Sequence, residues 1–195
     1  MIDFLLNFLP EKSNFLNLFS YLTTRTILST LTGLMMVLFL GDFFIRRARS
    51  LQFEQSIGDR GPDSHKLKDG TPTMGGILII GSVILSGFVW GDLTNKYLLI
   101  SLFCLIMFAL IGFADDFHKI KQKDQEGISG KSKIFWQFIC ACIIAVALYS
   151  SAETKMHTSY IVPFFKDVVL DLGPWFIFIS IFIIVGSSNA VNLTD

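Results

Sequence analysis

Four short segments of the sequence gather side chains that could bind phosphate or a metal ion. The first, residues 66–76, contains two lysines and the run Gly-Thr-Pro-Thr-Met-Gly-Gly. Thr71 or Thr73 can cap a helix that begins here, and Pro72 suits its first turn. Backbone N–H groups at such a helix start attract phosphate, and Lys68 adds a cation. The segment is therefore either a phosphate site or a capped helix beside a basic anchor.

The second segment is the pair of adjacent carboxylates Asp115 and Asp116, which ends a long apolar stretch. We expect both acids at the C-terminus of a helix, where the helix dipole disfavours anions and the two charges repel each other. Such a pair needs a compensating cation, either Lys119, one turn after Asp115, or a bound Mg²⁺. The alternative is a solvated helix end that marks the membrane interface.

The third segment is the run Gly-Ile-Ser-Gly at residues 127–130, which is surrounded by lysines. These are Lys119, Lys121, Lys123, Lys131 and Lys133. We expect Lys119 and Lys131 to face an anionic ligand. A cluster of lysines is also what a cytoplasmic membrane loop carries for reasons of topology, so this signal is weak by itself.

The fourth segment carries amides and a carboxylate. Asn189 and Asn192 are one turn apart and Asp195 follows one turn later, so the three share a face if the helix persists. Polar groups that point into a helical bundle at membrane depth are costly unless they bind something. The pattern favours a binding function.

The elements that must position these groups are membrane helices. The 195 residues are 52% hydrophobic and only 16% charged, with a mean hydropathy of +0.58, which leaves too little charge to cover a soluble domain. Five stretches, each built around a run without Asp, Glu, Lys or Arg, predict an all-α, polytopic helical membrane protein. The expected spans are approximately 23–45, 74–91, 97–114, 134–151 and 174–191. Residues 1–22 are expected to form an interfacial segment, and residues 1–195 a single membrane domain.

Lysine and arginine are distributed unequally between the predicted loops. Eleven lie in the loops after the first and third spans, and five lie on the other side. By the positive-inside rule the first group of loops is cytoplasmic and the N-terminus is outside. This topology carries all four segments to the cytoplasmic face. Because the formal net charge is zero, no basic field argues for a nucleic-acid partner.

Three of these motifs resemble a known family of enzymes. Lys68 with the glycine-flanked run at 70–76, Ala-Asp-Asp at 114–116 and Asn-Ala-Val-Asn-Leu-Thr-Asp at 189–195 are similar to phospho-N-acetylmuramoyl-pentapeptide transferase, of the polyprenyl-phosphate N-acetylhexosamine-1-phosphate transferase superfamily. The resemblance implies transfer of phospho-MurNAc-pentapeptide from UDP-MurNAc-pentapeptide to undecaprenyl phosphate, which gives lipid I and UMP in peptidoglycan synthesis.

The same resemblance implies a setting for the enzyme. It implies about ten transmembrane helices, of which this chain would hold the N-terminal part, together with Mg²⁺ dependence and usually a homodimer. The site would lie on the cytoplasmic face of the bacterial inner membrane, where the soluble donor and the membrane lipid meet. Part of the metal site would then lie outside this chain, so we do not expect the 195 residues to be active alone.

The resemblance also assigns roles to individual residues. Asp115 would assist the lipid phosphate as a general base, Asp116 would support the site, and Asp195 would lie near the diphosphate as a Mg²⁺ ligand. The residues expected to bind the nucleotide-sugar and its phosphates are Lys68, Thr73, Lys119, Lys131, Asn189 and Asn192. Direct attack by the lipid phosphate and prior formation of a phospho-enzyme on an aspartate such as Asp116 both stay open.

Two other classes of protein are the alternatives. A small-solute transporter would also place acids in a helical bundle, but more often near the bilayer midplane and in helices broken within repeated halves. A non-catalytic membrane fragment would explain the helices without explaining the polar motifs.

Overall fold

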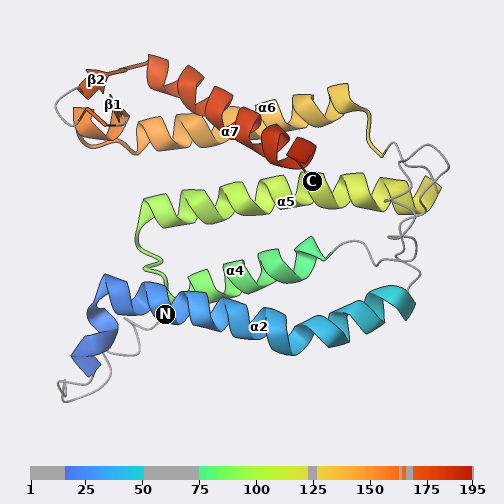
Figure 1. Cartoon of the computed structure of the whole chain (residues 1–195). Helices are drawn as coiled ribbons and strands as arrows, with labels where there is room; N and C mark the ends of the chain where they lie inside the picture. The colour runs from blue at the N-terminus through green and yellow to red at the C-terminus, as the bar shows by residue number, and fades with distance from the viewer. Residues whose placement is uncertain (1–15, 51–74, 123–126, 163, 166–168, 195) are drawn as a thin grey trace. The chain divides into compact units, whose positions relative to one another are not determined.

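The computed structural model describes residues 16–50, 75–122, 127–162, 164–165 and 169–194, and helices dominate this part of the chain (Figure 1). Its α-helices are α2 (Leu22–Ser50), α4 (Gly76–Trp90), α5 (Lys96–Gln122), α6 (Gly130–Ser150) and α7 (Trp175–Thr194). Each overlaps one of the five predicted spans. The all-α, polytopic fold is therefore confirmed.

Three of the described helices are long and apolar enough to cross a membrane, while two are shorter. The long ones cover Leu22–Ala48, Lys96–Lys121 and Gly130–Ser150, and the shorter apolar ones are Gly76–Trp90 and Trp175–Val191. At 1.5 Å per residue, the 15 residues of α4 extend about 22 Å, less than the hydrocarbon core of a typical bilayer.

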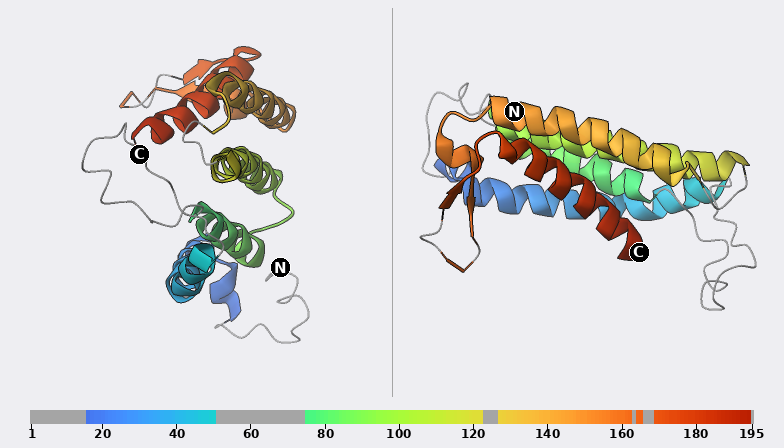
Figure 2. Two further views of the ribbon diagram at one scale, coloured as in Figure 1. Left: turned by 90° about the vertical axis from the view of Figure 1, so that its right-hand side faces the viewer. Right: turned by 90° about the horizontal axis from the view of Figure 1, so that it is seen from above.

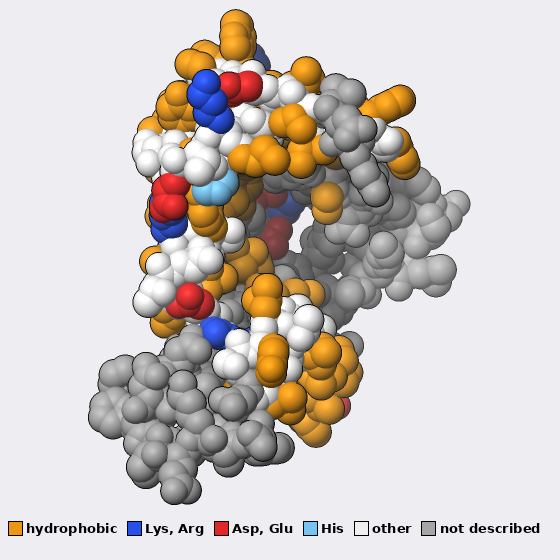
Figure 3. Space-filling model, turned by 90° about the vertical axis from the view of Figure 1, so that its left-hand side faces the viewer, with side chains coloured by type: hydrophobic (Ala, Val, Ile, Leu, Met, Phe, Trp, Pro, Cys, Tyr) orange, Lys and Arg blue, Asp and Glu red, His pale blue; other side chains and the backbone are white. Residues whose placement is uncertain are grey.

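Large hydrophobic side chains cover the outside of the described helices. Leu22 and Phe182 are each 79% exposed, and Phe39 is 78% exposed. Hydrophobic side chains also occupy much of the described surface on the face shown in Figure 3, between small groups of charged side chains. Apolar surface on this scale is stable when it contacts lipid or other protein, which agrees with a membrane-embedded chain.

The chain forms two compact units. One consists of Met1–Leu98 and Gly112–Ile128, and the other consists of Leu99–Ile111 and Ser129–Asp195. Within the first unit α2 and α4 lie side by side, and within the second unit α6 and α7 do so (Figures 1 and 2).

Small residues form the contact between α2 and α4. Ser82 and Ser86 of α4 are 2% and 5% exposed, and a Cβ atom at Gly33 of α2 would lie 3.7 Å from the Ser86 hydroxyl. The two serine hydroxyls donate to the carbonyls of Ile79 and Val83 in their own helix. Small residues let helix backbones approach in an apolar environment, where packing is the main attraction between helices.

Trp90, at the C-terminal end of α4, ties that end to the beginning of α2. Its carbonyl accepts from Arg25 Nε at 2.7 Å, and its indole N–H donates to Thr32 Oγ1 at 3.0 Å. The Trp90 ring also stacks on Phe19 with centroids 6.2 Å apart. Phe19 belongs to a short 3-10 helix, η1 (Leu16–Ser20), which lies within the predicted interfacial segment 1–22; residues 1–15 of that segment lie outside the described residues.

The start of α4 differs from the prediction. The N-cap is Gly75, which makes no side-chain cap hydrogen bond. Thr71 and Thr73, the predicted caps, lie outside the described residues, and neither occupies the N-cap position of this helix. Gly75 has right-handed helical backbone angles, with φ of −56° and ψ of −26°, which residues other than glycine also adopt.

The contact between α6 and α7 uses one face of α6. The buried residues there are Gln137, Cys140, Ala141, Ile144 and Ala145, which recur at the three- and four-residue spacing of a helical stripe. Most are small, as in the α2–α4 contact. Gln137 is the exception, because it is an amide that is only 2% exposed.

The segment between α6 and α7 has more structure than the sequence suggested. After a short 3-10 helix, η2 (Lys155–Thr158), it forms an antiparallel hairpin of β1 (Ser159–Ile161) and β2 (Val169–Asp171). No strand was predicted between the fourth and fifth spans. Strands of three residues are too short to give a recognisable alternation in the sequence.

Candidate functional site

The carboxylate pair lies inside α5 rather than at its end. The helix continues past Asp115 and Asp116 to Gln122 and has Lys119 and Lys121 in its last turn. The prediction of a helix C-terminus at the acids was therefore wrong, because the polar residues that follow are good helix formers and basic ones favour the dipole's negative end. The acids thus stand on regular helix, with fixed spacing to Lys119.

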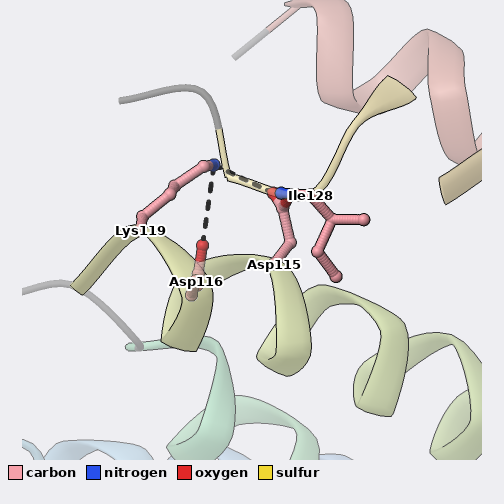
Figure 4. Close-up of polar contacts among 4 residues, drawn as sticks. All are labelled: Asp115, Asp116, Lys119 and Ile128. Atoms are coloured by element: carbon pink, nitrogen blue, oxygen red, sulfur yellow. Dashed lines mark hydrogen bonds and ion pairs between the residues drawn. The ribbon is translucent and has the colours of Figure 1, made fainter. Parts of the chain in front are cut away.

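Asp115 is almost fully buried and both of its oxygens have donors. It is 6% exposed, its Oδ2 lies 2.9 Å from Lys119 Nζ, and its Oδ1 accepts from the backbone N–H of Ile128 at 3.0 Å. Figure 4 shows these contacts converging on the carboxylate from α5 and from the segment before α6. Lys119, one of the two compensating cations that the sequence allowed, is in place. Buried charges need such partners to remain ionised.

Asp116 belongs to the same cluster but is more open. Its Oδ1 lies 3.9 Å from Lys119 Nζ, and its side chain is 41% exposed. Two carboxylates and one ammonium give the three side chains a net charge of −1. By themselves, these three side chains would repel a phosphate group.

The donors present fit Mg²⁺ in kind but form only a partial set. Mg²⁺ takes oxygen ligands and often uses one or two carboxylates together with substrate phosphates and water. Asp116 offers such a carboxylate, while both oxygens of Asp115 already accept from protein donors. Among the described residues no group of three His, Cys, Asp or Glu side chains could hold a metal ion.

A second polar cluster joins α6 to α7. Asn189 Nδ2 donates to Gln137 Oε1 at 2.7 Å and to the Val185 carbonyl at 2.8 Å. Gln137 Nε2 in turn donates to Ser188 Oγ at 3.4 Å. Asn189 is therefore fixed against its neighbours in the second unit, and its two amide hydrogens are both used.

The other predicted site residues are only partly placed. Lys131 is exposed in the first turn of α6, and Asn192 falls within the last turns of α7. Lys68, Thr73 and Asp195 lie outside the described residues. The structure thus brings together Asp115, Asp116 and Lys119, in agreement with their predicted grouping.

Three contributors to these clusters were not predicted as site residues. Gly127 and Ile128 supply the backbone that covers Asp115, and Gln137 orients Asn189. The only signal for Gln137 was that it is the one amide side chain in the apolar stretch 134–151. In the sequence Gly127 is simply a glycine in a predicted loop, and this pattern indicates neither its backbone angles nor its contact with Asp115.

Comparison with known protein families covers both units. The family model described as glycosyl transferase family 4 matches residues 98–195, a range that contains both polar clusters. The phospho-N-acetylmuramoyl-pentapeptide-transferase signature 1 matches residues 68–80, which include Lys68, Thr73 and the start of α4. The resemblance inferred from the motifs is confirmed. The family comprises membrane-bound glycosyl-1-phosphate transferases that transfer a sugar 1-phosphate from a nucleotide-sugar to a polyprenyl phosphate, and this chain belongs to it as a member that carries the phospho-N-acetylmuramoyl-pentapeptide-transferase signature.

Proposed function

We propose that the protein transfers phospho-MurNAc-pentapeptide from UDP-MurNAc-pentapeptide to undecaprenyl phosphate, with Mg²⁺, and so makes lipid I and UMP for peptidoglycan synthesis. The observation that carries the proposal is the Asp115–Asp116–Lys119 cluster on an apolar helix, in a chain with the transferase signature at 68–80. The signature favours the muramoyl-pentapeptide donor over other nucleotide-sugars.

The reaction exchanges one phosphorus–oxygen bond for another. An oxygen of the lipid phosphate forms a bond to the phosphorus that carries the sugar, and the bond from that phosphorus to UMP breaks. Charge is spread over the phosphoryl oxygens in the transition state, so positioning and neutralisation supply most of the catalysis.

The cluster on α5 is suited to neutralise first the Asp115 carboxylate and then the charge of a bound phosphate. Lys119 can move from Asp115 to an incoming phosphate, since its side chain is one-third exposed. That movement would release Asp115 Oδ2, which could then accept the last proton of the lipid phosphate or orient it. A phosphate monoester is largely ionised above pH about 6, so orientation is the larger part of this role.

The net charge of the cluster is the physical reason to propose Mg²⁺. When bound, Mg²⁺ would add two positive charges beside the diphosphate and turn the cluster's net charge from −1 to +1. Asp116 is the described residue suited to hold it, with Asp195 proposed as a further carboxylate.

The remaining predicted residues would bind the nucleotide-sugar. We place Lys68 and Thr73 of the signature segment at this donor, together with Asn189 and Asn192 of α7. Lys131 would approach its phosphates. The setting proposed for the enzyme is the cytoplasmic face of the bacterial inner membrane, as a homodimer.

The test uses the purified protein, as its gene encodes it, in lipid nanodiscs. With labelled UDP-MurNAc-pentapeptide, undecaprenyl phosphate and Mg²⁺, we expect a lipid-linked product and one UMP per transfer. Asp115→Asn should lower kcat roughly 100-fold or more, in the range of a lost proton-transfer or orienting group, and change the donor KM little.

The matched control is Asp92→Asn in the loop between α4 and α5. Asp92 is exposed, and hydrogen bonds from the Thr94 side chain and backbone lower its pKa. This variant should keep wild-type turnover. A wild-type protein that forms no lipid-linked product would refute the proposed function, and full activity of Asp115→Asn would remove the role of the cluster.

A further inference from the structure

The described residues just before α6 contact Asp115 through their backbone. Ile128 N–H donates to Asp115 Oδ1 at 3.0 Å, and Gly127, which precedes it, has a φ of +61°. Residues with a Cβ rarely adopt this left-handed conformation, whereas glycine does so at no steric cost. The direction of the Ile128 amide therefore depends on the backbone angles of Gly127.

A second observation concerns the space around Gly127. A Cβ atom there would lie 2.6 Å from Asp115 Oδ1, 2.7 Å from Lys119 Cε and 3.2 Å from Asp115 Cγ. The first two separations are shorter than atoms tolerate, so any other residue would displace the carboxylate or the lysine. Both atoms lie near the ends of flexible side chains and can shift, but a shift of either disturbs the ion pair, an effect separate from the strain at positive φ.

We propose that Gly127 is a positioning residue for Asp115. It allows the backbone to cover the carboxylate and the Ile128 amide to hold Oδ1, so that Oδ2 alone faces Lys119 and is the oxygen that can change partners. Since Asp115 is 6% exposed, water does not replace a lost amide donor freely. This role rests on the proposed function, in which Asp115 acts on the lipid phosphate.

The rival explanation is that glycine is needed only to shape the connection between the helices. Two substitutions at the same position separate the explanations. Gly127→Ala opposes both φ and the available space. Gly127→Asn is better tolerated at positive φ but still places a Cβ against Asp115 and Lys119. A requirement for φ alone predicts that Asn works better than Ala, whereas a requirement for space predicts that both fail.

The matched control is Gly130→Ala, three residues later. A Cβ at Gly130 would meet nothing within 4 Å, and Gly130 is the first residue of α6, where alanine is favourable. This variant should leave kcat and stability at or above wild-type values.

The first readout is steady-state kinetics of the protein in nanodiscs. Gly127→Ala and Gly127→Asn should both lower kcat roughly tenfold or more, as expected when a reacting group is displaced by a fraction of an ångström to an ångström. The donor KM should stay within about twofold, because Gly127 is not placed at the donor. Wild-type kcat in either variant would overturn the proposal.

The second readout does not need activity. The drop in Tm caused by Gly127→Ala should shrink by at least about half in an Asp115→Ala background, because the contact that the substitution damages is then already lost. An equal drop in both backgrounds would overturn the proposal. If the wild-type protein transferred nothing, the proposed function would fail, and this coupling alone would decide whether Gly127 positions Asp115.

Discussion

Asn189 shows how hydrogen bonds between neighbouring helices determine what a polar side chain can offer a ligand. Both hydrogens of its amide are donated, one to Gln137 Oε1 and one to the Val185 carbonyl. Its Oδ1 accepts no hydrogen bond from the described residues. In the proposed site Asn189 would therefore act as an acceptor, suited to a hydroxyl or ring N–H of the nucleotide-sugar rather than to a phosphate oxygen.

The Gln137–Asn189 contact gives a prediction at the residue scale. In a double-mutant cycle, Gln137→Ala and Asn189→Ala should be coupled by about 0.5–2 kcal/mol, because each single change takes one hydrogen-bond partner from the other amide, and Gln137 is buried. Unfolding in a mild detergent, followed as Tm and denaturant midpoint, measures the four proteins of the cycle.

The control cycle pairs Gln137→Ala with Ser180→Ala. Ser180 lies nine residues before Asn189 in α7, about 13 Å along the axis, so these two effects should add within about 0.5 kcal/mol. Additivity in the Gln137–Asn189 cycle as well would mean that the hydrogen bond contributes nothing to holding α6 against α7.

At the scale of the helices, two glycines of α2 have the same residue type but different surroundings. Gly33 faces Ser86 and Ser82 of α4, at 3.7 and 4.0 Å from its would-be Cβ, whereas a Cβ at Gly41 of the same helix would meet nothing within 4 Å. Gly33 and Gly41 both lie in a helix where alanine would be equally acceptable. They differ in whether another helix packs against them, which a hydropathy profile does not record.

We therefore predict opposite outcomes for two leucine substitutions. Gly33→Leu should force α2 and α4 apart and destabilise the protein by about 1–3 kcal/mol, the usual effect of overpacking. Gly41→Leu should be neutral or slightly stabilising, since leucine is the better helix former. Thermal unfolding of both variants in nanodiscs is the measurement, and equal losses would show that the small-residue contact does not determine this pairing.

The helices also show what the sequence could and could not predict. Uncharged stretches were enough to place five helices, because the membrane imposes length and hydropathy on each one separately. The run of α5 past Asp116 was missed because a drop in hydropathy was taken as the end of the helix, although helix formation continues through lysine and glutamine. The hairpin at 159–171 and the partners Gly127 and Gln137 depend on contacts between distant residues, which no local pattern specifies.

At the scale of the whole molecule, the proposed chemistry needs one topology. The donor is soluble and the acceptor is a membrane lipid, so the carboxylates must stand at the cytoplasmic surface. Of the 16 lysines and arginines, the eleven in the loops after the first and third spans argue for this orientation. This orientation can be tested on α5 alone, because Thr94 precedes the helix and Lys121 lies in its last turn, so that the two residues mark its two ends.

Labelling single cysteines decides the orientation. In a background where Cys104, Cys140 and Cys142 are replaced by alanine, a membrane-impermeant maleimide should label Thr94→Cys in intact spheroplasts. Lys121→Cys should react only after the membrane is opened, and Lys68→Cys should behave like Lys121→Cys. The reverse pattern would put the Asp115 cluster on the outer face, away from a nucleotide-sugar. Labelling of Lys121→Cys and Lys68→Cys from opposite sides would separate the signature segment from the carboxylates, so that no single phosphoryl-transfer site could contain both.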